Sequence, residues 1–200
     1  MYPDSLRKAI ESFQKLPGIG EKTAERLAFA VLEFSEDEIE EFSNSFTNLK
    51  QIIKPCSICG TLTDDQECFI CLDKTRDKKT LIVVEDSKSV FLFERIGNFH
   101  GFYHVLGGLI SPLDDIGPED IRIKELIERI KKEDIKEVIL AIKSGIEADT
   151  TSLYIKKILE DLGVLVSRIA SGIPIGADMD YVDALTLESA LNNRKEVLSD

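Results

Sequence analysis

The stretch CSICGTLTDDQECFIC, residues 56–71, organises the chain on either side of it. It contains all four cysteines of the protein as two Cys-x-x-Cys pairs, namely Cys56, Cys59, Cys68 and Cys71. Each pair places two thiolates one tight turn apart, and two such pairs can form a tetrahedral Zn²⁺ site. The surrounding residues 54–74 include too few apolar side chains to build a core. We therefore expect bound zinc to stabilise this segment as a compact finger.

Disulfide or redox use of the same cysteines is the main alternative. Residues 1–20 carry no apolar stretch of the kind found in signal peptides, and they include several charged side chains, namely Asp4, Arg7, Lys8, Glu11 and Lys15. A chain without an export signal is expected in the reducing cytoplasm, where thiols stay free. The cytoplasmic prediction therefore favours zinc over disulfides.

Composition and charge limit the class of protein. The 200 residues are 43% hydrophobic and 31% charged, which is typical of a globular protein. No run of about 18 apolar residues is present, so no membrane partner is expected. The net charge of −12 argues against a protein covered by positive charge. The acids are concentrated in residues 33–41, however, which leaves room for a local basic site in residues 1–30.

The N-terminal part of the chain has the pattern of three helices. Apolar residues recur at helical spacing in residues 5–15, from Glu21 onward, and from Ser35 to about Ile53. Ser35 and Glu38 have the spacing of a capping box at the start of the third helix. Residues 1–54 are thus predicted to form a helical domain.

The segment LPGIG, residues 16–20, separates the first two helices. Glycines at 18 and 20 permit positive φ and close approach to a ligand, and the helix that follows presents unpaired N–H groups to an anion. Lys22 and Arg26 lie four residues apart and share a helix face. Together these features resemble the helix-hairpin-helix motif, which grips the sugar-phosphate backbone without reading bases. The resemblance implies that Gly18, Gly20, Lys22 and Arg26 bind DNA.

The same segment allows two other interpretations. The glycines are compatible with a simple tight turn between helices. The string Gly20-Glu21-Lys22-Thr23 also resembles the end of a Walker nucleotide loop. Glu21 separates the glycine from the lysine and a helix precedes the segment, and both features argue against a nucleotide loop.

The remainder of the chain alternates apolar runs with amphipathic stretches. Strands are predicted at residues 80–85, 102–106, 137–142 and 165–170, and helices at residues 87–96, 118–132, 150–162 and 180–193. Nearly continuous apolar strands that alternate with helices indicate a parallel sheet with helices on both faces. His104 alternates with apolar residues and is expected to pack in the core.

Four acids follow the first and third predicted strands: Glu85, Asp86, Glu147 and Asp149. The carboxyl ends of parallel strands meet at one edge, so three of these carboxylates could hold Mg²⁺, or one could act as a general acid beside a metal. Alternatively, Asp86 and Asp149 serve only as helix N-caps. Three acids of the tail, Asp178, Asp180 and Asp183, are expected to be solvated acids at a helix start.

The order of these motifs resembles the RecR family of bacterial recombination-mediator proteins, and the resemblance covers nearly the whole chain. It is carried by LPGIGEKTAERLA (16–28), CSICGTLTDDQECFIC (56–71), LIVVED (81–86), FYHVLGGLISPLDDIGPEDIRIKEL (102–126) and RIASGIPIGADMDYVDALTLESAL (168–191). The resemblance implies a multi-domain α/β protein. Its expected parts are a helix-hairpin-helix domain (1–54), a four-cysteine zinc finger (55–73), a Toprim domain (79–174) and a C-terminal Walker-B-like segment with a helix (175–200).

The family pattern also implies functional positions. Its zinc ligands fall on the four cysteines, and its basic hairpin residues fall on Lys22 and Arg26. Its Toprim acids fall on Glu85 or Asp86 and on Glu147, with Asp149 nearby. The segment AIKSGIEAD, residues 141–149, departs from the usual Ala-Thr-Asn-Pro opening and Glu-Gly-Glu, and the Asp-x-Asp of Toprim enzymes is missing there.

The leading interpretation is a non-catalytic DNA-binding mediator of DNA repair and recombination. The resemblance implies a homo-oligomer, either a dimer or a ring-shaped tetramer that clamps DNA, and partnership with RecO and RecF in loading the recombinase RecA on gapped DNA. The low basic content predicts weak, salt-sensitive DNA binding. Two alternatives remain: an Mg²⁺-dependent Toprim nuclease or primase-like enzyme, and a protein-interaction scaffold that does not bind DNA.

Overall fold

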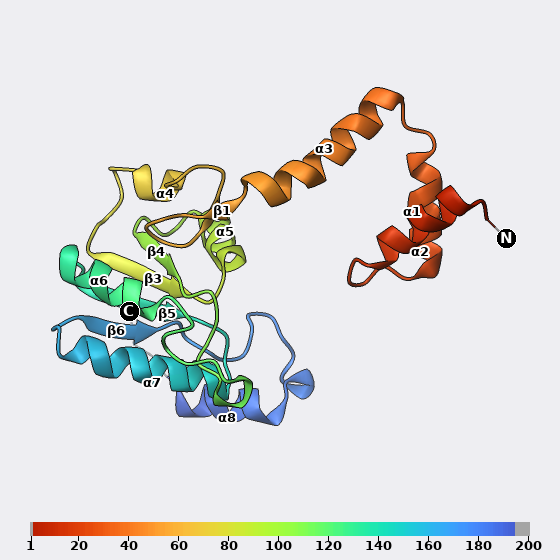
Figure 1. The fold of residues 1–200 in the computed structure, drawn as a ribbon. Coiled ribbons are helices and arrows are strands. Elements are labelled where there is room, and N and C mark those ends of the chain that lie inside the picture. Colours follow the sequence, from red (N-terminus) through yellow and green to blue (C-terminus); the bar gives the residue numbers. More distant parts are fainter. Residues whose placement is uncertain (1, 195–200) are drawn as a thin grey trace. The chain divides into compact units, whose positions relative to one another are not determined.

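The computed structural model describes residues 2–194, which fall into two compact units that divide between Ile53 and Lys54 (Figure 1). The first unit contains three helices. The second contains the cysteine segment, a four-stranded sheet and its helices. Within the described residues, no helix is both long and apolar enough to cross a membrane.

In the first unit, helix α1 (Asp4–Gln14) packs against α2 (Glu21–Val31). Their small shared core is formed by Ile10, Ala24 and Ala28. Two alanines at the contact let the helix backbones approach closely, which leaves little space to fill between them. The prediction of two helices separated by residues 16–20 is confirmed.

Helix α3 (Glu36–Ile52) begins with the predicted capping box. The backbone N–H of Glu38 donates to Ser35 Oγ at 3.3 Å, and the backbone N–H of Ser35 donates to Glu38 Oε2 at 2.7 Å. The hydrogen bonds from Ser35 hold the pKa of the Glu38 carboxyl below its usual range. The start of this helix is therefore determined locally by the sequence.

The second unit opens with the cysteine segment. Strand β1 (Lys54–Pro55) pairs antiparallel with β2 (Leu62–Thr63), and the short helix α4 (Phe69–Leu72) follows. This small ribbon shares one core with the sheet, since Cys56, Cys59 and Ile70 belong to the same buried cluster as the strands.

The main sheet consists of four parallel strands in the order β4-β3-β5-β6. The strands are β3 (Thr80–Val84), β4 (Phe102–Val105), β5 (Glu137–Ala141) and β6 (Leu165–Arg168). Each starts where the sequence predicts and ends one or two residues earlier. The four residues from Leu81 to Val84 are buried, so both faces of the inner strand β3 are covered.

The helices between the strands are α5 (Ser87–Ile96), α6 (Ile123–Lys132) and α7 (Ile146–Glu160). From β3 the chain crosses to β4 on one side of β3. From β4 it returns past β3 to β5, and then continues in the same direction to β6. Right-handed crossovers then put α5 on one face of the sheet and α6 and α7 on the other.

The side chains of β4 confirm that helices cover both faces. The Tyr103 hydroxyl donates to Glu94 of α5 at 2.8 Å, whereas Arg129 of α6 lies 5.6 Å from the centroid of the neighbouring Phe102 ring. Adjacent residues of a strand point to opposite faces, so the two helices lie on opposite sides. His104 is fully buried, as predicted, and burial lowers its pKa to about 4, which keeps the ring neutral at neutral pH.

Helix α6 starts five residues later than predicted, at Ile123 instead of Pro118. A turn takes the place of the expected first helical turn: the N–H of Gly117 donates to Asp120 Oδ2 at 2.8 Å. Ile121 is buried, and the Arg122 N–H donates to the carbonyl of Leu106. These two contacts precede the first helical residue, Ile123. The local signal of proline and acids is overridden by these tertiary contacts.

Two other helix boundaries differ from the prediction. Helix α7 begins at Ile146, so Asp149 lies within its first turn and is not its N-cap. The last helix, α8 (Ala184–Asn192), begins after the 3-10 turn Met179–Tyr181 instead of at Asp180. Asp183 caps it by accepting from the Thr186 N–H at 2.9 Å. The final six residues of the predicted C-terminal segment, 195–200, lie outside the described residues.

Candidate zinc centre and nucleic-acid interface

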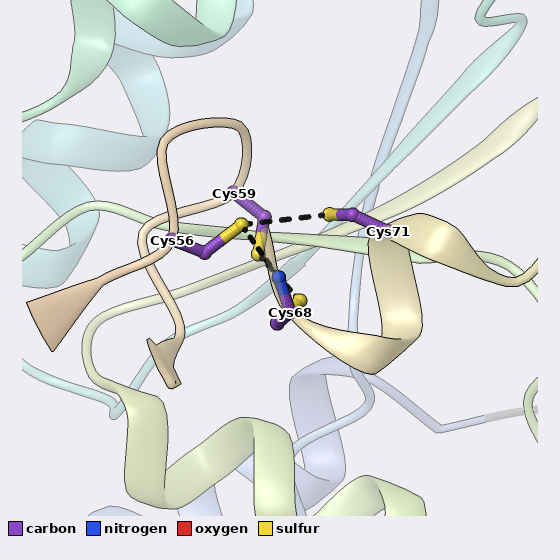
Figure 2. A group of neighbouring side chains, drawn as sticks. All are labelled: Cys56, Cys59, Cys68 and Cys71. Carbon is purple, nitrogen blue, oxygen red and sulfur yellow. Dashed lines mark hydrogen bonds between the residues drawn. The ribbon is translucent and has the colours of Figure 1, made fainter. Parts of the chain in front are cut away.

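The four cysteine sulfurs face one another between the turn that follows β1 and helix α4 (Figure 2). Cys56 and Cys59 come from the turn after β1, Cys68 precedes α4, and Cys71 lies within α4. All four Sγ atoms lie within 4.8 Å of one another, with Cys59 and Cys68 at 3.5 Å and Cys56 and Cys71 at 3.9 Å. None of the four forms a disulfide.

These distances match the geometry of a tetrahedral metal site. Four sulfurs bound to zinc at about 2.3 Å lie about 3.8 Å apart in a tetrahedron. No other group of three or more His, Cys, Asp or Glu side chains in residues 2–194 has its ligand atoms this close together. The cysteine cluster is therefore the one preassembled metal cage of the described chain.

Crowding shifts the pKa values of two of the sulfurs in opposite directions. Hydrogen bonds from Cys59 and Cys71 lower the pKa of Cys68. Contact with the Cys59 and Cys68 side chains raises the pKa of Cys71. The backbone N–H of Cys68 donates to Cys56 Sγ at 3.3 Å, and the Thr61 hydroxyl lies 3.2 Å from Cys59 Sγ. A bound cation would supply the positive charge that four crowded sulfurs require.

The zinc ribbon is joined to the sheet by its own backbone. The Val105 N–H at the end of β4 donates to the carbonyl of Cys59 at 2.7 Å, and the Leu62 N–H donates to the Ser87 hydroxyl at 3.0 Å. Because Cys59 is both a metal ligand and a hydrogen-bond acceptor for β4, the position of the metal and the position of the sheet depend on each other.

Gly60 occupies the point where the ribbon and the sheet meet. Its φ of +79° lies in the left-handed region, and an added Cβ would come 2.8 Å from Arg122 Nε and 3.1 Å from the Val105 carbonyl. The neighbouring Gly107 has nearly the same φ of +81° but faces open space. The two glycines thus have the same left-handed backbone conformation, but only Gly60 has neighbouring atoms where a side chain would lie.

We expect Gly60→Ala to lower stability more than Gly107→Ala. Both substitutions incur left-handed strain of roughly 1–2 kcal/mol, but only the first also forces Arg122 and β4 away. Thermal unfolding and zinc content of both variants measure the difference. Equal melting temperatures and equal zinc content would show that the ribbon is not tightly docked at Gly60.

The hairpin between α1 and α2 leaves the N-terminus of α2 uncapped by any side chain. Gly18 has a φ of +82°, and Gly20 is the N-cap of α2 with no side-chain cap. The first N–H groups of α2 are therefore available to a ligand. Lys22 and Arg26 are exposed on this helix, and neither forms an ion pair within the described residues.

The glycine at position 20 is not required by packing. An added Cβ there would meet no atom within 4 Å, and the φ of −83° is open to any residue. A side chain at this position would instead project into the space beside the helix N-terminus. A glycine at this N-cap therefore leaves the helix N-terminus open to close approach.

The acids of the sheet edge are each held by a separate partner. Lys143 Nζ lies 3.1 Å from Glu85 Oε1, and the Ser111 hydroxyl donates to Glu147 at 3.0 Å. Asp149 pairs with Arg168. Asp86 accepts from the Ser89 N–H at 2.9 Å and is the N-cap of α5, as the capping alternative predicts.

Sequence reasoning missed the cations of this edge. Lys143 and Arg168 supply positive charge to Glu85 and Asp149, two of the acids that one alternative assigned to Mg²⁺. Lys143 is part of AIKSGIEAD, the segment that departs from the family pattern, so the departure itself was the available signal. Arg168 ends β6 next to β5, and only the strand order brings it to Asp149.

Four family models match the chain in the order of its structural parts. They are the RecR helix-hairpin-helix at residues 6–49, the RecR four-cysteine zinc finger domain at residues 53–73, the Toprim domain at residues 79–170 and the RecR C-terminal region at residues 172–195. The chain belongs to the RecR family. Together with the sulfur geometry, the match identifies the cysteine cluster as a zinc site. The RecR domains support a recombination-mediator role in DNA repair.

Proposed function

We propose that the chain is a non-catalytic recombination mediator that holds DNA by its sugar-phosphate backbone and acts with RecO-type and RecF-type partners to load the recombinase on gapped DNA. The observation that supports DNA binding best is the uncapped N-terminus of α2 beside Gly20, flanked by exposed Lys22 and Arg26. Contacts to phosphates through backbone N–H groups and cations carry no sequence information, which suits a mediator that acts wherever a gap occurs.

The overall charge sets the expected strength of binding. A net charge of −12 repels DNA at long range, so the local cations must act at short range. A single hairpin with two cations gives weak binding that falls steeply with salt. A homo-oligomer that presents several hairpins to one DNA molecule raises the overall affinity through effective concentration. We therefore include a homo-oligomer, as a dimer or ring tetramer, in the proposal.

The double variant Lys22→Ala with Arg26→Ala tests the hairpin. We expect it to weaken binding to unrelated DNA sequences to the same degree and to reduce the slope of log K against log salt by about 1–2. Fluorescence anisotropy with labelled oligonucleotides at several salt concentrations provides the measurement.

Lys131→Ala with Lys132→Ala is the matched control, since it removes the same charge from exposed positions of α6. Its affinity and slope should stay close to those of the unmodified protein. Equal losses in the two double variants would mean that only net charge matters, and an unchanged hairpin variant would remove the hairpin from DNA binding.

The acidic edge is proposed to meet partner proteins instead of catalysing a reaction. Glu85 and Asp149 are already paired with Lys143 and Arg168, so binding Mg²⁺ there would require breaking two ion pairs. A protein partner with basic side chains can exchange these pairs for intermolecular ones at similar cost.

We expect no Mg²⁺-dependent nicking of supercoiled plasmid by the purified protein, and we expect Glu85→Gln to leave DNA affinity unchanged. Gel electrophoresis of plasmid incubated with Mg²⁺ measures the first, and anisotropy measures the second. Nicking that disappears in the Glu85→Gln variant would support the Toprim nuclease alternative and contradict the non-catalytic proposal.

A further inference from the structure

The four cysteines of the metal site differ in their access to solvent. Cys56, Cys59 and Cys68 are buried, whereas Cys71 is only partly buried. Cys71 also lines a cavity of about 220 Å³, which has room for several molecules the size of water. Hydrogen peroxide is little larger than water. Cys71 is therefore the ligand that a small oxidant reaches first.

The cavity beside Cys71 contains positive charge. Its walls come from the ribbon, the segment before β3, strand β4 and helix α6, and the other lining residues are Ile58, Lys78, Phe102, Arg129 and Glu133. Arg129 is paired with Glu133, since Arg129 Nε lies 3.1 Å from Glu133 Oε2. Lys78 is exposed and forms no ion pair within residues 2–194, so its ammonium group is available to a solute in the cavity. Partly exposed cysteines with cations nearby are the reactive ones in proteins.

Cys71 has a second sulfur within reach. Cys56 Sγ lies 3.9 Å from Cys71 Sγ, and Figure 2 shows the two side chains pointing toward each other from the turn after β1 and from α4. Cys59 and Cys68 are both buried and lie 3.5 Å apart as a pair of their own. This pairing of the sulfurs makes Cys56 the partner for an oxidised Cys71 and leaves Cys59 and Cys68 shielded.

We propose that Cys71 is an oxidation site, at which a peroxide converts Cys71 and Cys56 into a disulfide and thereby removes two of the four ligands of the zinc site. Bound zinc keeps the sulfurs in the thiolate form, which is the nucleophilic one. The proposal goes beyond DNA and partner binding and depends on neither, because it rests on the cysteine cluster and the cavity beside it.

The reaction consumes one hydrogen peroxide for each disulfide. The Cys71 sulfur donates an electron pair to one peroxide oxygen, so that an S–O bond forms and the O–O bond breaks. The hydroxide that leaves takes up a proton and becomes water. The Cys56 sulfur then attacks the sulfenic sulfur of Cys71, so that the S–S bond forms, the S–O bond breaks and a second hydroxide leaves as water. The two sulfurs together lose two electrons, and the peroxide gains them.

Loss of two ligands has a structural consequence. Only Cys59 and Cys68 remain, and a structural zinc site requires four ligands. The Cys59 carbonyl, which accepts from the Val105 N–H, is then no longer fixed by the metal. Oxidation should therefore release the metal and loosen the ribbon from β4, and reduction of the disulfide by a thiol should reverse both effects.

Zinc release from the zinc-loaded full chain tests the oxidation site. Hydrogen peroxide is added under conditions that fully oxidise free cysteine, and a colorimetric chelator measures the released zinc. The remaining thiols are labelled with N-ethylmaleimide and located by fragmentation of the tryptic peptide 51–74, which contains all four cysteines. We expect release of the zinc, label on Cys59 and Cys68 only, and recovery of zinc binding after dithiothreitol. Retained zinc, a different pair of labelled cysteines, or irreversible loss of zinc binding would overturn the proposal.

Two lysine variants test the cavity as the place of reaction without removing a metal ligand. Lys78→Ala and Lys79→Ala each remove one exposed lysine from neighbouring positions, but only Lys78 lines the cavity with Cys71. We expect peroxide to release zinc about two- to fivefold more slowly from the Lys78→Ala variant, because the ammonium group no longer stabilises the leaving hydroxide. The Lys79→Ala variant should react like the unmodified protein. Equal rates in all three proteins, equal slowing in both variants, or faster release from the Lys78→Ala variant would overturn the assignment of the reaction to this cavity.

Discussion

The hydrogen bond between the Cys59 carbonyl and the Val105 N–H connects the metal site to the sheet, and the second unit depends on this connection. Cys59 contributes its sulfur to the metal and its carbonyl to the end of β4. A ribbon with two-residue strands and a four-residue helix has almost no core of its own. It gains order from the metal on one side and from the buried surface of the sheet on the other.

This arrangement explains why the acidic edge and the zinc ribbon lie on one rigid unit, whereas the basic hairpin is built separately by α1 and α2. The hairpin needs only two glycines, a helix N-terminus and two exposed cations, all of which are local features. The proposed function assigns DNA to the hairpin of the first unit and protein partners to the acidic edge of the second, so this division of chemistry fits that proposal. Under the same proposal, weak DNA contacts are an advantage, because the DNA is then passed to the recombinase.

Much of this could be predicted from the sequence, because its signals are local. The capping box at Ser35, the starts of all four strands and the cysteine pairs follow from short-range spacing. The start of α6 was misplaced because the contacts of Ile121 and Arg122 with the sheet override a helical signal at Pro118. Lys143 and Arg168 were missed as partners of the acids because strand order, and not chain spacing, brings Arg168 to Asp149.

Hydrogen exchange at the Val105 amide, with zinc bound and after its removal by a chelator, tests the central claim most directly. The account predicts one zinc per chain and strong protection of this amide that is lost with the metal, while the amides of Ile10 and Ala24 in the separate helical unit exchange as before. A protected Val105 amide in the zinc-free protein would contradict the account, because the sheet edge would then hold its shape without the metal.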